Sequence, residues 1–243
     1  MVRLLLLPFS VAPARQRAEA ARRVGSATLL FVHIPKCAGT SFRRIIKAWY
    51  GHKALFSDAT APELARAVGD RAELPRAIAG HLPFGQHHTL PCRPFYVSLV
   101  RHPLDRFVSL YKHARAVPDH LFHGPASRLE LEPFYDFCLQ DRRARGQTMA
   151  VQCFYLSGSR AFEDARAVIN ARYELVAPVE CYDRFVERCA EATGKPRLVQ
   201  PPSNVGLPDA QVDFARAALA RRVEQDHRQD LLLHDYVRSR FRD

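Results

Sequence analysis

The feature that most constrains the fold is an apolar run followed at once by a glycine-containing loop and an amphipathic helix pattern. Residues 28–33 (TLLFVH) form a short, continuous apolar run, which is typical of a strand buried on both faces of a parallel sheet. The next loop contains Pro35 and Gly39, and residues 41–50 (SFRRIIKAWY) then place apolar side chains at helical spacing. The segment therefore predicts a strand, a tight loop and a helix in direct succession.

Strand and helix patterns alternate along the rest of the chain. Further strand patterns cover residues 77–80, 95–100 and 173–177. Helical patterns cover residues 60–68, 104–116, 133–143, 149–156, 181–193 and 209–241. This alternation predicts an α/β fold whose mainly parallel sheet is flanked by helices on both faces and binds ligands at the carboxyl ends of its strands.

Proline and glycine mark the predicted irregular segments. Residues 117–132 contain Pro118, Gly124 and Pro125, and we interpret them as a long loop or lid. Residues 195–208 are too rich in proline for regular structure.

The length of 243 residues suits one α/β domain, which we assign to residues 27–243. Residues 1–26 are predicted to be a peripheral leader outside that domain. Their apolar run, residues 4–7, is interrupted by Pro8 and falls far below the roughly 20 residues of a membrane-spanning helix. We therefore expect no membrane span and a cytoplasmic location.

Basic residues exceed acidic ones, 36 to 25, which gives a formal net charge of +11. This charge favours polyanionic partners, but the arginines are scattered over many predicted helices. The scatter argues against a dedicated nucleic-acid surface, so we expect no nucleic-acid partner.

The six cysteines form no CxxC pair and no zinc-type spacing, so we expect no structural metal. Their apolar surroundings suit a reducing compartment.

The loop after the first strand has the properties of an anion site. Backbone amides at the start of the following helix point toward the loop, with the positive end of the helix dipole behind them. Gly39 allows close approach of a phosphate, Thr40 and Ser41 offer hydroxyl groups, and Lys36 adds a charge. The Walker pattern places Gly-Lys directly before Ser or Thr, whereas here the lysine precedes Gly-Thr-Ser by two residues. An ordinary helix cap would explain the hydroxyl groups but not the preceding Pro-Lys pair.

A second polar constellation follows the strand at residues 95–100. Arg101 stands at the strand end, and Ser109 lies about two turns into the following helix. An arginine fork and a serine hydroxyl can together bind a second phosphate. An Arg-x-Pro turn before a helix is by itself often structural, so the order of the two segments carries this interpretation.

Together, residues 33–42 (HIPKCAGTSF) and 101–111 (RHPLDRFVSLY) resemble the paired phosphate motifs of the PAPS-dependent carbohydrate sulfotransferases, the group of the heparan sulfate 2-O-sulfotransferase and its bacterial relatives. This resemblance implies a P-loop-NTPase-like fold, 3′-phosphoadenosine 5′-phosphosulfate (PAPS) as donor and no metal. It also implies that residues of both motifs bind the cofactor. These residues are Lys36, Cys37, Ala38, Gly39, Thr40 and Ser41 at the 5′-phosphosulfate, and Arg101 and Ser109 at the 3′-phosphate.

The resemblance also implies the catalytic residues. Gly80-His81 matches the Gly-His segment in which the heparan enzyme's base lies, so we assign His81 as the base, and Lys36 as the cation at the leaving group. His87 and His88 are the fallback candidates for the base. Asn204-Val205 faintly resembles a late Asn-Val segment of the family.

The chain departs from the family pattern at three positions. Cys37 and Ala38 stand where Thr and Gly are usual, and His102 stands where Asp is usual. These departures concern fine geometry more than activity. The absence of an obvious anchor, unlike in the family's Golgi members, fits a bacterial cytoplasmic enzyme.

Two other functions are compatible with parts of this pattern. An atypical P-loop kinase would need a magnesium-binding acidic residue at a strand end, and we identify no convincing one. A non-catalytic binder of nucleic acid or sulfated polysaccharide would need only the positive charge. Our hypothesis is in-line transfer of a sulfuryl group from PAPS to a hydroxyl of an acceptor, with an anionic saccharide as the expected acceptor.

Overall fold

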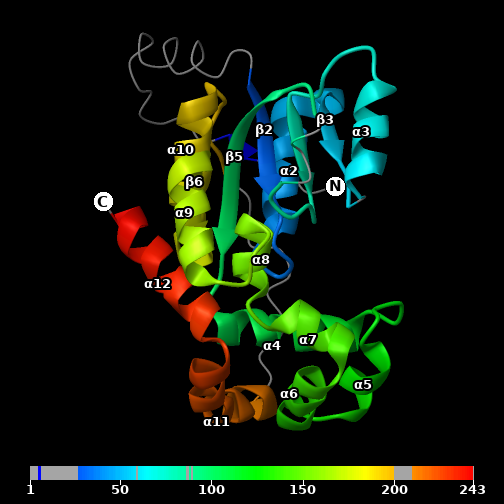
Figure 1. Cartoon of the computed structure of the whole chain (residues 1–243), viewed down its shortest axis with the longest axis vertical. Coiled ribbons are helices and arrows are strands. Elements are labelled where there is room, and N and C mark those ends of the chain that lie inside the picture. The colour runs from blue at the N-terminus through cyan, green and yellow to red at the C-terminus, as the bar shows by residue number, and fades with distance from the viewer. Residues whose placement is uncertain are drawn as a thin grey trace.

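The computed structural model describes residues 5–6, 27–58, 60–85, 88, 90–199 and 210–242. Its centre is a five-stranded sheet in the order β3-β4-β2-β5-β6, in which all four pairings are parallel (Figure 1). The strands are β2 (Ala27–Val32), β3 (Ala54–Phe56), β4 (Ala77–Gly80), β5 (Arg93–Val100) and β6 (Tyr173–Pro178). The predicted α/β class with a parallel sheet is confirmed.

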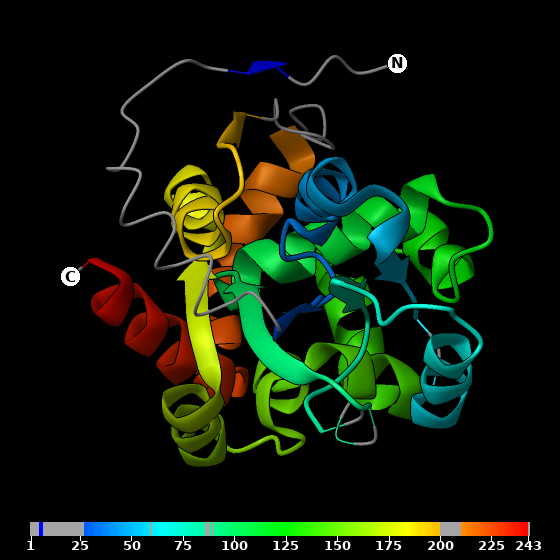
Figure 2. The same ribbon diagram turned by 90° about the horizontal axis from the view of Figure 1, so that it is seen from above.

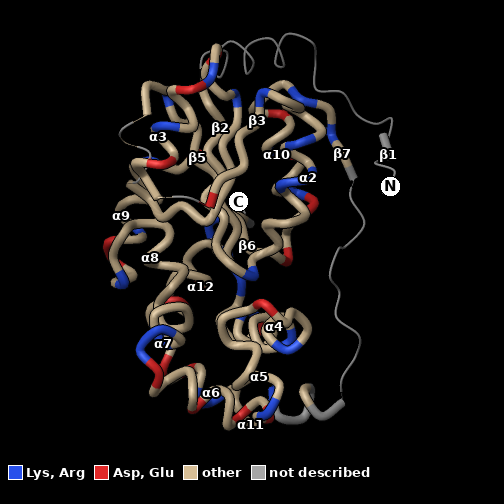
Figure 3. Tube along the Cα trace, turned by 90° about the vertical axis from the view of Figure 1, so that its right-hand side faces the viewer, with Lys and Arg blue, Asp and Glu red and all other residues tan. Residues whose placement is uncertain are grey.

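Helices cover both faces of the sheet, as predicted. Figures 2 and 3 show α2 (Gly39–Tyr50) and α10 (Tyr182–Thr193) on one face, and α8 (Val151–Ser157), α9 (Phe162–Arg172) and α12 (Arg228–Arg242) on the other. Because β2 is covered on both faces and paired on both edges, all six of its residues are buried. This explains why its sequence is a continuous apolar run.

The remaining helices form a second part of the molecule beyond the carboxyl ends of the strands (Figure 1). They are α4 (Pro103–Ala116), α5 (His123–Arg128), α6 (Leu131–Gln140), α7 (Arg142–Thr148) and α11 (Ala210–Asp226). Their apolar side chains form a core cluster of their own, separate from the cluster around the sheet. Helix α3 (Ala61–Gly69) belongs to neither group and lies beside β3, an edge strand of the sheet (Figure 1).

The predicted turn chemistry at two helix ends is confirmed. Thr60 and Glu63 form the expected capping box of α3, with the Thr60 amide donating to Oε2 of Glu63 at 2.8 Å. Gly194 ends α10 in the left-handed conformation at φ 65°.

The prediction that residues 117–132 form a long loop is wrong. Helix α5 lies inside this range, and α6 begins at its end. Gly124 and Pro125 fall in the first turn of α5, where backbone amides need no intrahelical partner, so neither residue prevents the helix. Phe122 and Ala126 are buried in the second core cluster and hold the segment in place.

Other elements were not expected from the sequence. Strand β3 and helix α9 were missed, and so was the pairing of β1 (Leu5–Leu6) with β7 (Leu198–Val199). The helix predicted at residues 133–143 is two helices, because Asp141 caps α7 by accepting from the amides of Arg143 and Ala144. Apart from residues 5–6, the predicted leader lies outside the described residues. Among the described helices, none combines the length and apolar character needed to cross a bilayer.

Candidate active site

Three neighbouring strands end at the same edge of the sheet, and each leads into a candidate segment. Strand β2 lies between β4 and β5, with Val32 in register with Gly80 on one side and with Ser98 on the other. The loop at residues 33–41, His81 and Arg101 therefore follow adjacent strand ends. The strands that follow β2 in the chain lie on both sides of it, with β3 and β4 on one side and β5 and β6 on the other, and ligands bind at such switch points in open parallel sheets.

The backbone of the first loop adopts an unusual conformation. Lys36 and Ala38 both have positive φ angles, 69° and 56°, which non-glycine residues rarely adopt. The turn closes through the Cys37 amide, which donates to the Ile34 carbonyl at 3.2 Å. Helix α2 then begins at Gly39 without a side-chain cap. The Ser41 amide donates to the Ala38 carbonyl at 3.2 Å, and the amides of Gly39 and Thr40 precede it at the helix start, where anions bind.

Gly39 is required by a close approach to His33. A Cβ atom at Gly39 would lie 1.8 Å from Cδ2 of His33. The His33 ring is buried and stacks on Phe31 and His81, with centroid distances of 5.6 and 4.1 Å. Burial, followed by the nearby charge of His81, lowers the pKa of His33 to about 3, so this imidazole is neutral. His33 thus supports the loop through its packing against Gly39.

The two predicted phosphate segments are in direct contact. Nη1 of Arg101 donates to the carbonyl oxygen of Lys36 at 3.3 Å, although the residues are 65 positions apart. Burial, followed by the positive charge of Arg101, lowers the pKa of Lys36 to about 8. The Arg101 guanidinium group is therefore held at the backbone of the Lys36 loop, close enough for the two positive charges to repel each other, which is an arrangement that an anion with more than one phosphate would stabilise.

The other predicted binding residues differ in exposure. Thr40 is exposed, Ala38 and Ser109 are half-buried, and the side chain of Ser41 is buried at the start of α2. Cys37 is buried, and its thiol points toward Oε1 of Gln152 at 3.5 Å rather than into the open loop. Burial raises the pKa of Cys37 to about 12, so the thiol remains protonated.

His81 is fixed in one orientation by its own strand end and by β2. Its Nδ1 lies 2.7 Å from the carbonyl oxygen of His33, which can only accept a hydrogen bond. In the neutral ring Nδ1 must therefore carry the proton, and Nε2 presents a lone pair. This is the tautomer that a general base requires.

Asp58 is a site residue that the sequence did not reveal. Its Oδ1 accepts from the backbone amide of His81 at 2.8 Å, and its other oxygen lies 3.5 Å from Nη1 of Arg43. Burial would raise the pKa of Asp58, but the amide of His81 and the positive charges nearby lower it. Asp58 is the second residue after β3, which is only three residues long, so no strand pattern pointed to it. Gly80 is required here because a Cβ atom would lie 1.5 Å from the Ser57 carbonyl oxygen.

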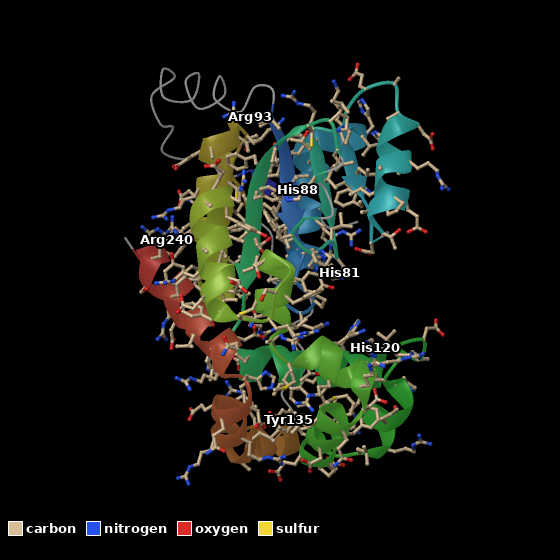
Figure 4. The ribbon with its side chains drawn as sticks, viewed as in Figure 1. His81, His88, Arg93, His120, Tyr135 and Arg240 are labelled. Carbon is tan, nitrogen blue, oxygen red and sulfur yellow. The ribbon has the colours of Figure 1, made fainter. Side chains whose placement is uncertain are left out.

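Gln152 and two histidines are further polar groups near the loop. Gln152 is fully buried between the two phosphate segments, and its position in an apolar helix pattern was the only signal for it. His113 and His120 pack together with a centroid distance of 5.4 Å. Burial, followed by the charge of Lys36, lowers the pKa of each. Figure 4 shows His120 in the helical part and His81 at the strand ends, on either side of the junction between the two parts.

The fallback candidates for the base do not share this position. Figure 4 places His88 away from the carboxyl ends of the strands, near the middle of the sheet. His87 and the Asn204-Val205 pair lie outside the described residues. Among the residues that the structure describes, no group of three His, Cys, Asp or Glu side chains could hold a metal ion.

Comparisons with known proteins relate this geometry to a family. A family model described as "Sulfotransferase family" matches residues 22–152, which is more than half of the chain and includes the three strand ends. Comparison with curated proteins finds no match. Among solved structures, the chain is similar to mouse sulfotransferase SULT7A1 complexed with PAP. The identity is 13% and the TM-score 0.47, over 94% of this chain and 84% of that chain.

Proposed function

Because the chain belongs to the sulfotransferase family, we propose that it transfers the sulfuryl group of PAPS to a hydroxyl of a carbohydrate acceptor. The observation that carries this proposal is the contact between Arg101 and the Lys36 carbonyl. It joins the two segments that would bind the two phosphate-bearing ends of the donor.

The donor would bind through residues of both segments. The first turn of α2, with Gly39, Thr40 and Ser41, offers amides and hydroxyl groups to the 5′-phosphosulfate, and Lys36 offers a positive charge. Arg101 and Ser109 would bind the 3′-phosphate, since a guanidinium group and a hydroxyl donate to phosphate oxygens. Residues 37 and 38 contribute to the shape of the loop, because the Cys37 side chain is buried and Ala38 adopts the left-handed conformation.

In the proposed reaction, the acceptor oxygen attacks sulfur while the bond from sulfur to the bridging phosphate oxygen breaks. Nε2 of His81 takes the proton of the attacking hydroxyl, and the bond electrons leave with adenosine 3′,5′-bisphosphate. A positioned base of this kind contributes about 10²- to 10⁴-fold to the rate. Lys36 stabilises the negative charge that develops on the leaving oxygen, and such electrostatic stabilisation is often the largest contribution to catalysis.

The acceptor proposal rests on charge. The formal net charge of +11 favours an anionic partner, and an anionic saccharide would supply both the charge and the hydroxyl. Basic residues are spread over many elements with acidic residues among them, which is not the pattern of a nucleic-acid groove (Figure 3).

Calorimetry with adenosine 3′,5′-bisphosphate tests the donor assignment, with ATP as comparison and with or without magnesium. We expect preferential, metal-independent binding of the bisphosphate. Tighter binding of ATP would overturn the assignment and favour a kinase.

The His81→Ala variant tests the base. We expect its turnover to fall by at least about 100-fold while the bisphosphate affinity stays close to that of the wild type. Near-normal turnover would refute the role of His81.

A further inference from the structure

Gln152, at the start of α8, contacts both of the segments that we assign to donor binding. Its Oε1 accepts from the Arg101 amide at 2.8 Å, and its Nε2 donates to the Arg101 carbonyl at 2.8 Å. The same Oε1 lies 3.5 Å from the Cys37 thiol, which remains protonated and can donate. One buried amide side chain thus binds the backbone beyond β5 and the loop beyond β2.

The Gln152 side chain takes the place of a neighbouring strand for the backbone of Arg101. Strand β5 ends at Val100, so the backbone amide and carbonyl of the next residue no longer pair within the sheet. A primary amide side chain presents an N–H donor and a carbonyl acceptor side by side. Gln152 satisfies both backbone groups and fixes the direction in which the Arg101 side chain leaves the strand end.

Gln152 is itself anchored from another helix. Asp230, in the first turn of α12, is fully buried and accepts from the amides of Gln152 and Cys153 at 3.3 and 3.1 Å. This carboxylate caps α8, whose own first residues provide no side-chain cap. Burial raises the pKa of Asp230, and the charge of the buried Arg106 opposes this shift.

Arg106 stabilises the end of α7, the helix that precedes α8. It lies on α4, is buried, and donates to the carbonyl oxygens of Gln147 and Thr148 at the end of α7, at 3.2 and 3.0 Å. Asp230 therefore joins α8 to α12, and Arg106 joins α4 to the end of α7, the helix that precedes α8, before any donor binds. Groups held in this way do not need to reorganise on binding, which increases affinity.

We propose that Gln152 is a positioning residue that sets the relative placement of the two donor-phosphate segments, with Asp230 as its anchor. This inference rests on the proposed function. It adds a residue outside both motifs on which donor affinity depends.

The Gln152→Leu variant tests the proposal, because leucine fills a similar volume and makes neither hydrogen bond. We expect the affinity for adenosine 3′,5′-bisphosphate to fall about tenfold or more, because Arg101 would no longer be held in place before binding and would have to be ordered when the bisphosphate binds. Thr28→Val is the matched control. It removes a buried side-chain hydrogen bond, to the Pro75 carbonyl at 2.8 Å, at the opposite end of β2. We expect this control to lower the melting temperature and to leave the affinity unchanged.

A second variant keeps the test decisive if Gln152→Leu does not fold. In Gln152→Glu an ionised carboxylate would face the Arg101 carbonyl, whereas a protonated one could donate to it as the native amide does. The ratio of wild-type to variant affinity should therefore decrease as the pH is lowered from 8 to 5.5. A ratio that does not change with pH, or a folded Gln152→Leu variant that binds within twofold of the wild type, would overturn the role of Gln152. If the wild type itself failed to bind the bisphosphate, the donor assignment would be refuted instead.

Discussion

Replacing Gly39 with alanine tests the geometry of the donor loop most directly. The added Cβ would lie 1.8 Å from Cδ2 and 1.9 Å from Nε2 of His33, whereas ordinary contacts begin at 3.4 Å. Either the imidazole or the loop would therefore have to move by about 1.6 Å to reach that distance. The ring has little freedom to move, because it stacks on Phe31 on one side and on His81 on the other.

The loop is therefore expected to shift, with two measurable effects. Forcing an extra methyl group into a packed site costs about 1–3 kcal/mol, which lowers the melting temperature of a chain of this size by about 2–12 °C. Displacing the first amides of α2 also weakens the phosphate contacts. Losing one hydrogen bond to a charged group costs about 1.5–3 kcal/mol, so the bisphosphate affinity should fall at least about tenfold.

Calorimetry and thermal melting on the same preparations measure both effects. Gly146→Ala, on helix α7, is the matched control. A Cβ atom at position 146 would lie 3.9 Å from the nearest neighbouring atom, Nη2 of Arg160, and would therefore clash with nothing. This control should bind like the wild type and melt at the same or a slightly higher temperature. In the double variant Gly39→Ala/His33→Ala the clash is absent, so part of the lost affinity should return. A Gly39→Ala variant that binds within twofold of the wild type and melts at the same temperature would refute the reasoning.

Two further predictions concern the charges of the donor site. The lowered pKa of Lys36, about 8, means that its positive charge is lost as the pH rises through that value, so the wild-type bisphosphate affinity should decline between pH 7 and 9.5. Lys36→Arg keeps its charge and should not show this decline in calorimetry, and identical profiles for the two proteins would contradict the assignment. Ser109→Ala should weaken binding of the bisphosphate about tenfold. It should leave binding of adenosine 5′-phosphosulfate, which has no 3′-phosphate, unchanged, and an equal loss for both ligands would exclude the 3′-phosphate contact.

Local signals were sufficient to predict the central strands and the loop and helix that follow β2. The continuous apolar run at residues 28–33 and the apolar run at 95–100 indicated buried strands because each is covered on both faces. Parallel strands place their carboxyl ends at one edge, so the sequence predicted that the segments following them meet. The contact between Arg101 and Lys36 agrees with that expectation.

The parts that were missed depend on contacts between distant segments. Strand β3 has three residues and is defined by its pairing with β4, so Asp58 could not be placed beside His81 from the sequence. Gln152 has the local appearance of a polar residue in an apolar helix, and its partners lie 51 and 115 positions away. Residues 117–132 contain glycine and proline but are held in helical form by burial, which local turn signals do not report.

The three strand ends divide the proposed chemistry in a way that suits in-line transfer. The acceptor oxygen must attack sulfur from the side opposite the leaving oxygen, so the base that takes its proton and the cation at the leaving oxygen must come from different directions. His81 follows β4 and Arg101 follows β5, on opposite sides of β2, whose loop carries Lys36. A hydrogen bond to the His33 carbonyl, just beyond the end of β2, fixes the tautomer of His81, and the His81 ring stacks on the neutral imidazole of His33. Burial and Arg101 lower the pKa of Lys36, so the bound phosphates gain a cation that is poorly solvated and interacts strongly with them. The order of the strands thus places the proton acceptor His81 and the cation Arg101 on opposite sides of the loop that carries Lys36, and this loop is where the sulfuryl group would have to lie.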